Sequence, residues 1–403
     1  MPPLILGAGA SGLAAAAFFA RHDIPFLLIE RLDRVGKKLL STGNGRCNYS
    51  NLDMNPAHYG AAADFVQALY EATPPETVHA FWASLGLLHA EEEGRLYPRT
   101  MSASSVLDAL RKPLERVQSQ ILTDAEVVRL ERTGGGWQVF LADGRTLCGE
   151  RVLACMGGSA APKFGTDGAG AQILKALGLN IAAQAPALVQ LRCAAPRVSL
   201  KGLRVHAAPT LVLDGQEVAR EEGELLFTDY GVSGVCVLQL SSLAARALLR
   251  RAEVSLRIDL LPECPQAAWL DARLSEAPEE TVSQRLVGVF PRLLTQEILK
   301  AAHIPMTTTG GALSEAERAR LFAAIHTFAM EVVGTKGYDA AQVSSGGVRL
   351  REVDPKTMAA KRFPGLYLAG ELLDVDGPCG GYNLHFAIAS GLTAARAMLS
   401  REE

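Results

Sequence analysis

The stretch that most constrains the fold is a short apolar run near the start of the chain that breaks into three spaced glycines. The run LILGAGASGLAAAA begins at Leu4, places glycine at positions 7, 9 and 12, and continues rich in alanine. Strand, glycine turn and helix in this order are typical of a dinucleotide-binding unit. Gly7 would permit the tight turn, Gly9 the approach of a pyrophosphate, and Gly12 the packing of helix on strand. The N–H groups at the helix start would then face the phosphates.

A second strand is expected at residues 26–29, and it ends at Glu30. A carboxylate at the end of this strand is expected to accept hydrogen bonds from ribose hydroxyls. It would also repel a 2′-phosphate, so the sequence predicts FAD or NAD rather than NADP.

The segment RVGKKLLSTGNGRCNYSN, residues 34–51, is basic and rich in glycine. A helix N-terminus carries only roughly half a positive charge. Lys37, Lys38 and Arg46 are therefore predicted to balance the pyrophosphate, although a solvated basic loop is the alternative. Glycines in the segment would let the chain present polar groups to a flat ring. The residues expected there are Gly43, Asn44, Gly45, Cys47 and Asn48.

A second glycine-bearing turn lies near the other end of the chain. The apolar run after Gly365 ends at Gly370 and Glu371, and the loop DVDGPCGGYN precedes a helix expected from Leu384. Glu371, with Asp376 behind it, is predicted to accept hydrogen bonds from a ribityl chain. The helix start at Gly381, Tyr382 and Asn383 would direct N–H groups at flavin N1 and O2. NAD alone would leave this second turn without a function, which favours FAD.

Length and composition bound the rest of the chain. The 403 residues suggest two or three domains, and the net charge of −3 argues against a general nucleic-acid binder. Seven cysteines include no C-x-x-C and no metal-ligand spacing, which indicates a reduced, cytoplasmic protein without dithiol chemistry or a metal. No apolar run approaches a membrane span in length, and no Lys or Arg precedes the first run as in a signal peptide. The oligomeric state is not readable from the sequence.

Between the two turns, the sequence predicts an α/β first segment at residues 1–185. A capping box from Thr73 to Glu76 should open a helix to residue 85, and a second helix should cover 102–116. Three strand-like runs, at 125–132, 137–142 and 146–155, predict a β-meander in which Val127 would support an adenine. The third run leads into Cys155, Met156 and Gly157, which would close over the adenosine side or form an ordinary strand-to-helix turn.

The middle of the chain reads as an insertion without a nucleotide motif. Strand-like runs at 186–262, including all of 223–242, predict a small β-barrel. Residues 263–340 are helical in texture through 335, and Ser314 to Glu317 form a capping box. The insertion is expected to cover the flavin and supply the substrate surface. Residues 341–403 then return to the first domain.

Five segments together resemble a family of bacterial flavoproteins that includes aminoacetone-oxidase-like and bile-acid-inducible flavoprotein N-like members. They are GAGASGLAAA, GKKLLSTGNGRCNYSN, GELLFTDYGVSG, VSSGGVRLREVDPKTM and GLYLAGELLDVDGPCGGYN. The resemblance implies a two-segment, Rossmann-like FAD domain of the glutathione-reductase-like kind, interrupted by a β-barrel and a helical subdomain. It implies FAD contacts at Ala10, Ser11, Glu30, Arg31, Lys38, Asn48, Val127, Glu371, Asp376 and Gly381 to Asn383. The chain departs from the usual pattern at Asn44, at Cys155 with Met156, and at Asp229.

The function predicted from these features is that of an FAD-dependent oxidoreductase, which transfers hydride between flavin N5 and a small organic substrate. The GTDGAG run at 165–170 has the wrong spacing for a second dinucleotide turn, so NAD(P)H would be only a transient reductant, or oxygen the acceptor. An amine or aminoketone oxidase, a flavin-bound scaffold or RNA-modification partner, and an empty, degenerate site are the alternatives. Lys38, Cys47, Tyr382 and His385 are catalytic candidates, although a structural role fits each better.

Overall fold

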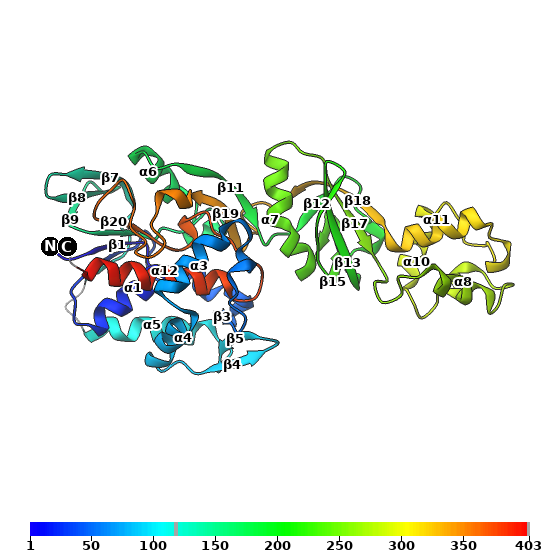
Figure 1. Cartoon of the computed structure of the whole chain (residues 1–403), viewed down its shortest axis with the longest axis horizontal. Coiled ribbons are helices and arrows are strands. Elements are labelled where there is room, and N and C mark those ends of the chain that lie inside the picture. Colours follow the sequence, from blue (N-terminus) through cyan, green and yellow to red (C-terminus); the bar gives the residue numbers. More distant parts are fainter. Residues whose placement is uncertain (117–119, 401–403) are drawn as a thin grey trace. The chain divides into compact units, whose positions relative to one another are not determined.

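The computed structural model describes residues 1–116 and 120–400, and its chain divides into two compact units (Figure 1). Unit 1 consists of Met1–Ala187 together with the C-terminal segment from Tyr338, and unit 2 is Leu188–Gly337. Each unit is built around its own cluster of buried apolar side chains.

The centre of unit 1 is a five-stranded sheet in the order β20-β10-β1-β2-β6. Its strands are β1 (Leu4–Leu6), β2 (Leu27–Ile29), β6 (Gln120–Leu122), β10 (Val152–Ala154) and β20 (Leu366–Leu368). All four pairings are parallel. The carboxyl ends of the five strands therefore lie along one edge of the sheet. Strands β2 and β6 extend the sheet on one side of β1, and β10 and β20 extend it on the other, so the strand order reverses at β1. In parallel sheets of this kind, ligands bind at the carboxyl edge where the strand order reverses.

Two helices from opposite ends of the chain pack together in unit 1. Helix α1 (Ala10–Arg21) follows β1, and helix α12 (Tyr382–Leu399) follows the second glycine turn. A Cβ on Gly391 of α12 would overlap the backbone oxygen of Ser11, so the absence of a side chain there permits the close approach. The N-terminal and C-terminal segments of unit 1 thus form one body.

The β-meander contains β7 (Val127–Thr133), β8 (Gly136–Leu141) and β9 (Thr146–Gly149). The third predicted run, 146–155, was wrong as a single strand, because it divides into β9 of the meander and β10 of the parallel sheet. The break falls at Gly149, where a Cβ would lie 2.7 Å from the side chain of Leu4. Helix α6 (Ala169–Leu177) follows β10.

The remaining helices of the first segment are α2 (Lys37–Leu40), α3 (Ala63–Ala72), α4 (Pro75–Ser84) and α5 (Ala103–Arg111). The predicted capping box at Thr73 is absent, because the N-cap of α4 is Pro74 and no side chain caps it. The Thr73 hydroxyl is instead buried 2.6 Å from the hydroxyl of Thr393 in α12. The second predicted helix is present as α5 with a 3-10 turn at Lys112–Arg116. A small sheet, ordered β3-β5-β4, contains β3 (Ser50–Asn51), β4 (His89–Glu92) and β5 (Arg95–Pro98).

Strands β11 (Ile181–Ala187) and β19 (Val343–Val348) form an antiparallel pair at the end of unit 1. Ala187 is in register with Val343, so the chain leaves unit 1 and re-enters it from neighbouring strands. Such paired connections allow an insertion that leaves the parallel sheet undisturbed.

Unit 2 contains strands whose pairings close into a ring, here called the strand ring. Its members are β12 (Leu191–Cys193), β13 (Arg204–Leu213), β15 (Gly223–Phe227), β16 (Gly231–Ser233), β17 (Val254–Asp259) and β18 (Phe328–Thr335). The ring closes because β13 pairs with β15 along its first half and with β17 along its second. Strand β14 (Gln216–Arg220) pairs with β13 beside the ring.

Two predictions for unit 2 were wrong. The strand-like run at 223–242 ends at Gly234, which has φ 104, and continues as helix α7 (Val235–Leu249). The helical texture predicted through 335 ends at His326, because Phe328–Thr335 alternates buried and exposed side chains and forms strand β18. Period-two burial of this kind is typical of a strand.

The helical part of unit 2 contains α8 (Ala267–Ser275), α9 (Val282–Arg285), α10 (Arg292–Ala301) and α11 (Glu315–His326). The predicted capping box at α11 is confirmed, since the Ser314 and Glu317 side chains each bond to the other's backbone N–H. Across the ranges that the structure describes, no helix is long and apolar enough to cross a membrane.

Candidate functional site

The carboxyl edge of the parallel sheet brings together segments that are far apart in sequence. Gly7 follows β1, Glu30 follows β2, Cys155 follows β10, and Gly370 follows β20. A Cβ on Gly370 would lie 2.6 Å from the Ser11 hydroxyl, so the second glycine turn touches the start of α1. The two turns that the sequence singled out therefore lie side by side in unit 1.

The glycines of the first turn have the spacing that a phosphate-binding turn requires. Gly7 has φ 99, in the left-handed region that favours glycine. A Cβ on Gly12 would overlap the carbonyl oxygen of Gly7, so only glycine lets α1 pack on β1 there. A Cβ on Gly9, by contrast, would have nothing within 4 Å. Gly9 therefore borders open space at the helix start, as expected where a pyrophosphate approaches.

Two helix N-termini lie at this edge without side-chain caps. The N-cap of α1 is Gly9 and that of α12 is Gly381, and neither helix start has a side-chain hydrogen bond. The first-turn N–H groups of a helix have no partner within the helix, and they carry partial positive charge. Ala10, Ser11, Tyr382 and Asn383 thus open helices that suit an anionic or acceptor-rich ligand.

The start of α12 is held in place by the small sheet. A Cβ on Gly381 would overlap the backbone of Ser50, and the Asn51 amide donates to the Gly380 oxygen at 2.9 Å. The Asn383 amide bonds in both directions with the Gly377 backbone, at 2.9 and 2.8 Å. The Asn383 side chain is thus engaged with its own loop, which contains Asp376, and it orders that loop before α12.

Glu30 is fixed at the end of β2 by backbone donors. Its two carboxylate oxygens accept from the N–H groups of Ala8 at 2.9 Å and Leu32 at 3.0 Å. A carboxylate has about four acceptor positions, so capacity remains for ligand hydroxyls. The Glu30 carboxylate is therefore fixed at the end of β2 with acceptor positions to spare.

Arg31 is held by two acidic residues that the sequence did not reveal. Its guanidinium donates to Asp167 at 2.7 Å and lies 3.2 Å from Glu126. The hydrogen bond to Asp167 raises the pKa of Arg31 above its ordinary value. Asp167 belongs to the GTDGAG run, whose spacing does not fit a dinucleotide turn. The run instead supplies the carboxylate that holds Arg31, the residue after Glu30. Val127, the first residue of β7, is half-buried and directly follows Glu126.

Lys38 joins the two segments of unit 1. Its ammonium lies 2.7 Å from the carboxylate of Glu371, and both side chains are about four-fifths buried. The other oxygen of Glu371 accepts from the Ser344 N–H at 2.8 Å. Among the three predicted counter-charges, Lys38 pairs with a carboxylate of the C-terminal segment. Lys37 and Arg46 pair with carboxylates of the N-terminal segment, Asp33 and Glu92.

The loop between Lys38 and Asn48 has an unusual backbone. Gly43 and Asn44 have φ 55 and 54, in the left-handed region. Asparagine is among the few residues that adopt this region readily, which explains how Asn44 replaces the usual glycine. The Asn48 amide donates to the carbonyls of Ser50 and Leu96 at 2.9 and 3.0 Å. The Asn48 side chain thus anchors the loop to the small sheet.

The catalytic candidates are buried. Cys47 is 0% exposed, and burial raises the pKa of its thiol to about 11, so it is not a thiolate at neutral pH. His385 is 0% exposed, and burial lowers its pKa to about 3. Its Nδ1 lies 2.8 Å from the Ser50 hydroxyl, which lies 2.9 Å from Nε2 of His79. Burial also raises the pKa of Tyr382. These states favour roles in shaping the site.

The third segment at the edge is Cys155, Met156 and Gly157. The Cys155 thiol is buried against the Gly7 carbonyl, at 3.4 Å, and burial raises its pKa. A Cβ on Gly7 would meet the Cys155 carbonyl oxygen at 2.6 Å. The departure from the usual pattern at Cys155 thus lies inside the packing of the glycine turn, and Gly157, with φ 75, turns the chain away from it.

FAD fits the residues present. Open space at Gly9 beside an uncapped helix start suits the pyrophosphate, and Glu30 suits the ribose. The second uncapped helix start and the Lys38–Glu371 pair add further polar groups from the C-terminal segment. In the described ranges, no group of three or more His, Cys, Asp or Glu side chains is placed to hold a metal ion.

Comparison with known proteins supports the same conclusion from end to end. The family described as HI0933-like protein Rossmann domain matches residues 2–397. A 3-dehydro-bile acid delta(4,6)-reductase from Clostridium scindens is 37% identical over 404 residues, or 98% of each chain. A ribosomal RNA dihydrouridine synthase from Escherichia coli is 28% identical over 98% of each chain.

Among solved structures, a 3-ketosteroid delta1-dehydrogenase from Sterolibacterium denitrificans in complex with 1,4-androstadiene-3,17-dione superposes with a TM-score of 0.52. The match covers 98% of each chain at 14% identity, and it supports the fold alone. The resemblance found in the sequence is confirmed by the family match and the reductase relative. The protein has a Rossmann-like FAD-binding fold and is an FAD-dependent oxidoreductase. It belongs to the HI0933-like protein Rossmann domain family.

Proposed function

We propose that this protein is a reductase that adds hydrogen across a carbon–carbon double bond conjugated to a carbonyl group in a small organic substrate. The observation that carries the proposal is the 37% identity, over 98% of both chains, to a named delta(4,6)-reductase. With one dinucleotide turn in the chain, the reductant is proposed to be NADH or NADPH that binds transiently and leaves before the substrate enters.

Bound FAD would supply the hydride chemistry, and the chain's own residues would hold and polarise it. The N–H groups at the start of α1 would bind the pyrophosphate, and Glu30 the ribose. Lys38 and Glu371 would hold the centre of the cofactor from the two segments. The positive end of α12 would favour negative charge that develops beside it during hydride transfer.

Buried thiol and imidazole groups would line this region without exchanging protons. A Cys47 pKa of about 11 and a His385 pKa of about 3 leave both side chains neutral over the physiological range. Their proposed role is to exclude water and fix the loop and helix start. Substitution of Cys47 by serine should therefore leave turnover within about threefold, because no thiolate is required.

Anaerobic stopped-flow absorbance tests the proposal. NADH or NADPH should bleach the flavin band, and a 3-oxo-Δ4 steroid should restore it faster than buffer does. Restoration by a saturated 3-oxo steroid at the same rate would contradict the need for a conjugated double bond. Bleaching by an amine or aminoketone, with failure of both nicotinamides, would replace the proposal with an oxidase.

A second candidate function is reduction of a uridine base in RNA. The observation that favours it is the 28% identity, over 98% of both chains, to a ribosomal RNA dihydrouridine synthase. Pre-reduced protein would then be reoxidised by ribosomal RNA that lacks dihydrouridine, and mass spectrometry would show a gain of two hydrogens in one nucleotide. Reoxidation by the unsaturated steroid, with no reaction of RNA, would exclude this candidate. Co-purification with RNA that resists moderate salt, without turnover, would support the scaffold alternative.

A further inference from the structure

A row of three polar residues crosses neighbouring strands of unit 2. Thr210 of β13 is in register with Arg220 of β14 on one side and with Arg257 of β17 on the other. Residues in register on adjacent strands project from the same face of a sheet. Two strand spacings of about 4.8 Å separate the backbones of the arginines by about 10 Å, so their long side chains can reach a shared ligand.

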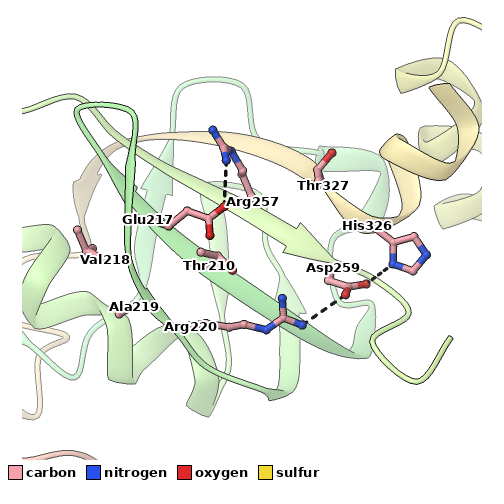
Figure 2. Close-up of a pocket in the computed structure, with 9 residues that line it drawn as sticks. All are labelled: Thr210, Glu217, Val218, Ala219, Arg220, Arg257, Asp259, His326 and Thr327. Carbon is pink, nitrogen blue, oxygen red and sulfur yellow. Dashed lines mark hydrogen bonds and ion pairs between the residues drawn. The ribbon is translucent and has the colours of Figure 1, made fainter. Parts of the chain in front are cut away.

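The row lies in a pocket of about 340 Å³, drawn in Figure 2. Arg220 and Arg257 are drawn on either side of Thr210, and Glu217, Asp259 and His326 are the other ionisable residues of the lining. Sites for small molecules begin at about 300 Å³, so the pocket has room for a ligand. The rest of the lining is Val218, Ala219 and Thr327.

Each arginine is held by one carboxylate and keeps other donors open. Arg257 contacts Glu217 at 3.0 Å, and Arg220 contacts Asp259 at 3.4 Å. A guanidinium group has five N–H donors, so these single contacts leave most of them available. The two arginine side chains are 46% and 53% exposed, whereas Thr210 is only 7% exposed. The pocket thus combines a buried hydroxyl with two accessible cations.

Asp259 is held by contacts on two sides. Asp259 accepts from the Leu261 N–H at 3.1 Å and lies 2.8 Å from Nδ1 of His326, the last residue of α11. The side chains of Asp259 and His326 are each 10% exposed. Because Asp259 ends β17, its contacts fix the position from which Arg220 is held. An ordinary surface ion pair lacks a buried partner of this kind.

We propose that this pocket binds a singly charged oxyanion, a carboxylate or a phosphodiester, between Arg220 and Arg257. Guanidinium groups recognise both anions through paired N–H donors, and Thr210 adds a hydroxyl donor at the floor. Glu217 and Asp259 already balance the two arginines, so a doubly charged phosphate monoester is disfavoured. The site lies within unit 2 and goes beyond the proposed reductase activity.

Titration calorimetry of the full flavin-loaded chain at constant ionic strength tests the proposal. Benzoate supplies a carboxylate, dimethyl phosphate a phosphodiester, and phenyl phosphate the monoester. Saturable binding of benzoate or dimethyl phosphate, whichever it is, supports the site and identifies the class of its ligand. Absence of binding by both, or tighter binding of phenyl phosphate than of either, would overturn it.

Three variants test whether the two arginines and Glu217 change the affinity for the anion in the expected directions. Arg257→Gln should weaken binding about tenfold, because it removes one of two cations. Glu217→Gln should tighten binding about threefold, because it frees Arg257 and removes a repelling charge. Arg204→Gln is the matched control, since Arg204 lies on the same strand as Thr210 but pairs with Glu224. Equal effects of Arg257→Gln and Arg204→Gln would show nonspecific attraction and refute the proposal. If Arg257→Gln does not fold, Glu217→Gln tests the proposal by itself. Weaker or unchanged anion binding in Glu217→Gln would then refute the proposal.

Discussion

The two units present groups for ligands in opposite ways. In unit 1, the carboxyl edge of the parallel sheet presents backbone groups. Gly12 has no room for a Cβ, Gly9 faces open space, and two helices start there without side-chain caps. In unit 2, the pocket uses side chains, with Arg220, Thr210 and Arg257 aligned by strand register. Backbone recognition leaves a glycine pattern in the sequence, whereas recognition by register leaves none.

The largest expected effect tests how tightly the first glycine turn is packed against α1. Gly12→Ala places a methyl group onto the Gly7 carbonyl oxygen, so we expect unit 1 to lose about 3 kcal/mol of unfolding free energy. Denaturant unfolding followed by circular dichroism measures the loss. A variant that folds with wild-type stability would show that the turn is looser than the packing indicates.

The next effect separates ligand binding from folding at the same turn. Gly9→Ala meets nothing within 4 Å, and Gly9 has φ −83, which alanine adopts freely. We expect its unfolding free energy without cofactor to stay within about 0.5 kcal/mol of wild type. Its FAD content should nevertheless fall at least about tenfold, because the methyl group takes the space of the pyrophosphate. Full retention of flavin would place the phosphate elsewhere.

A third prediction uses the contrast between the buried histidines. His326 of unit 2 bonds to a carboxylate, whereas His385 of unit 1 bonds to a hydroxyl. Burial lowers the pKa of His385 to about 3. Below an ordinary pKa of about 6.5 the unfolded chain binds a proton at this position that the folded chain does not. Stability is therefore complete above that value and falls as the pH falls.

The expected slope is about 1.4 kcal/mol per pH unit from this residue. Denaturant unfolding of unit 1 from about pH 7 to about pH 5 should show that slope reduced in His385→Gln. The matched control is His89→Gln, on the exposed strand β4, which should keep the wild-type slope. Equal slopes in wild type and His385→Gln would mean that the imidazole titrates normally.

The smallest effect concerns the ion pair that joins the two segments of unit 1. Glu371→Gln leaves Lys38 without a charged partner in a mostly buried place, so we expect a loss of about 1 to 2 kcal/mol. The double variant Lys38→Met with Glu371→Gln should lose less than the sum of the single losses. Lys201→Met, in the exposed pair with Asp229 of unit 2, should change nothing measurable. Additive losses would mean that the pair does not couple the segments.

The sequence revealed those parts of the structure that depend on local pattern. The strand–turn–helix at Gly7 to Gly12, the second turn at Gly370, and the capping box at Ser314 each follow from neighbouring residues. Partners that meet only through tertiary packing were missed, such as Asp167 for Arg31 and Ser344 for Glu371. No local signal connects residues so far apart.

The wrong secondary-structure predictions have the same origin. The apolar run after Gly234 suits a strand or a helix, and it forms α7 because its buried face packs on the strand ring. Thr73 has the sequence of an N-cap, yet its hydroxyl bonds to Thr393, because α12 returns beside it. Local preference is weak wherever a buried partner from elsewhere in the chain competes with it.

The most direct test of the account is the absorbance spectrum of the purified protein, followed by identification of the cofactor that denaturation releases. If two distant glycine turns form one site, wild-type protein is yellow and releases FAD in equal amount to chain, and Gly9→Ala is folded and colourless. Release of a nicotinamide dinucleotide instead, or a colourless wild-type protein that FAD cannot reconstitute, would contradict the account.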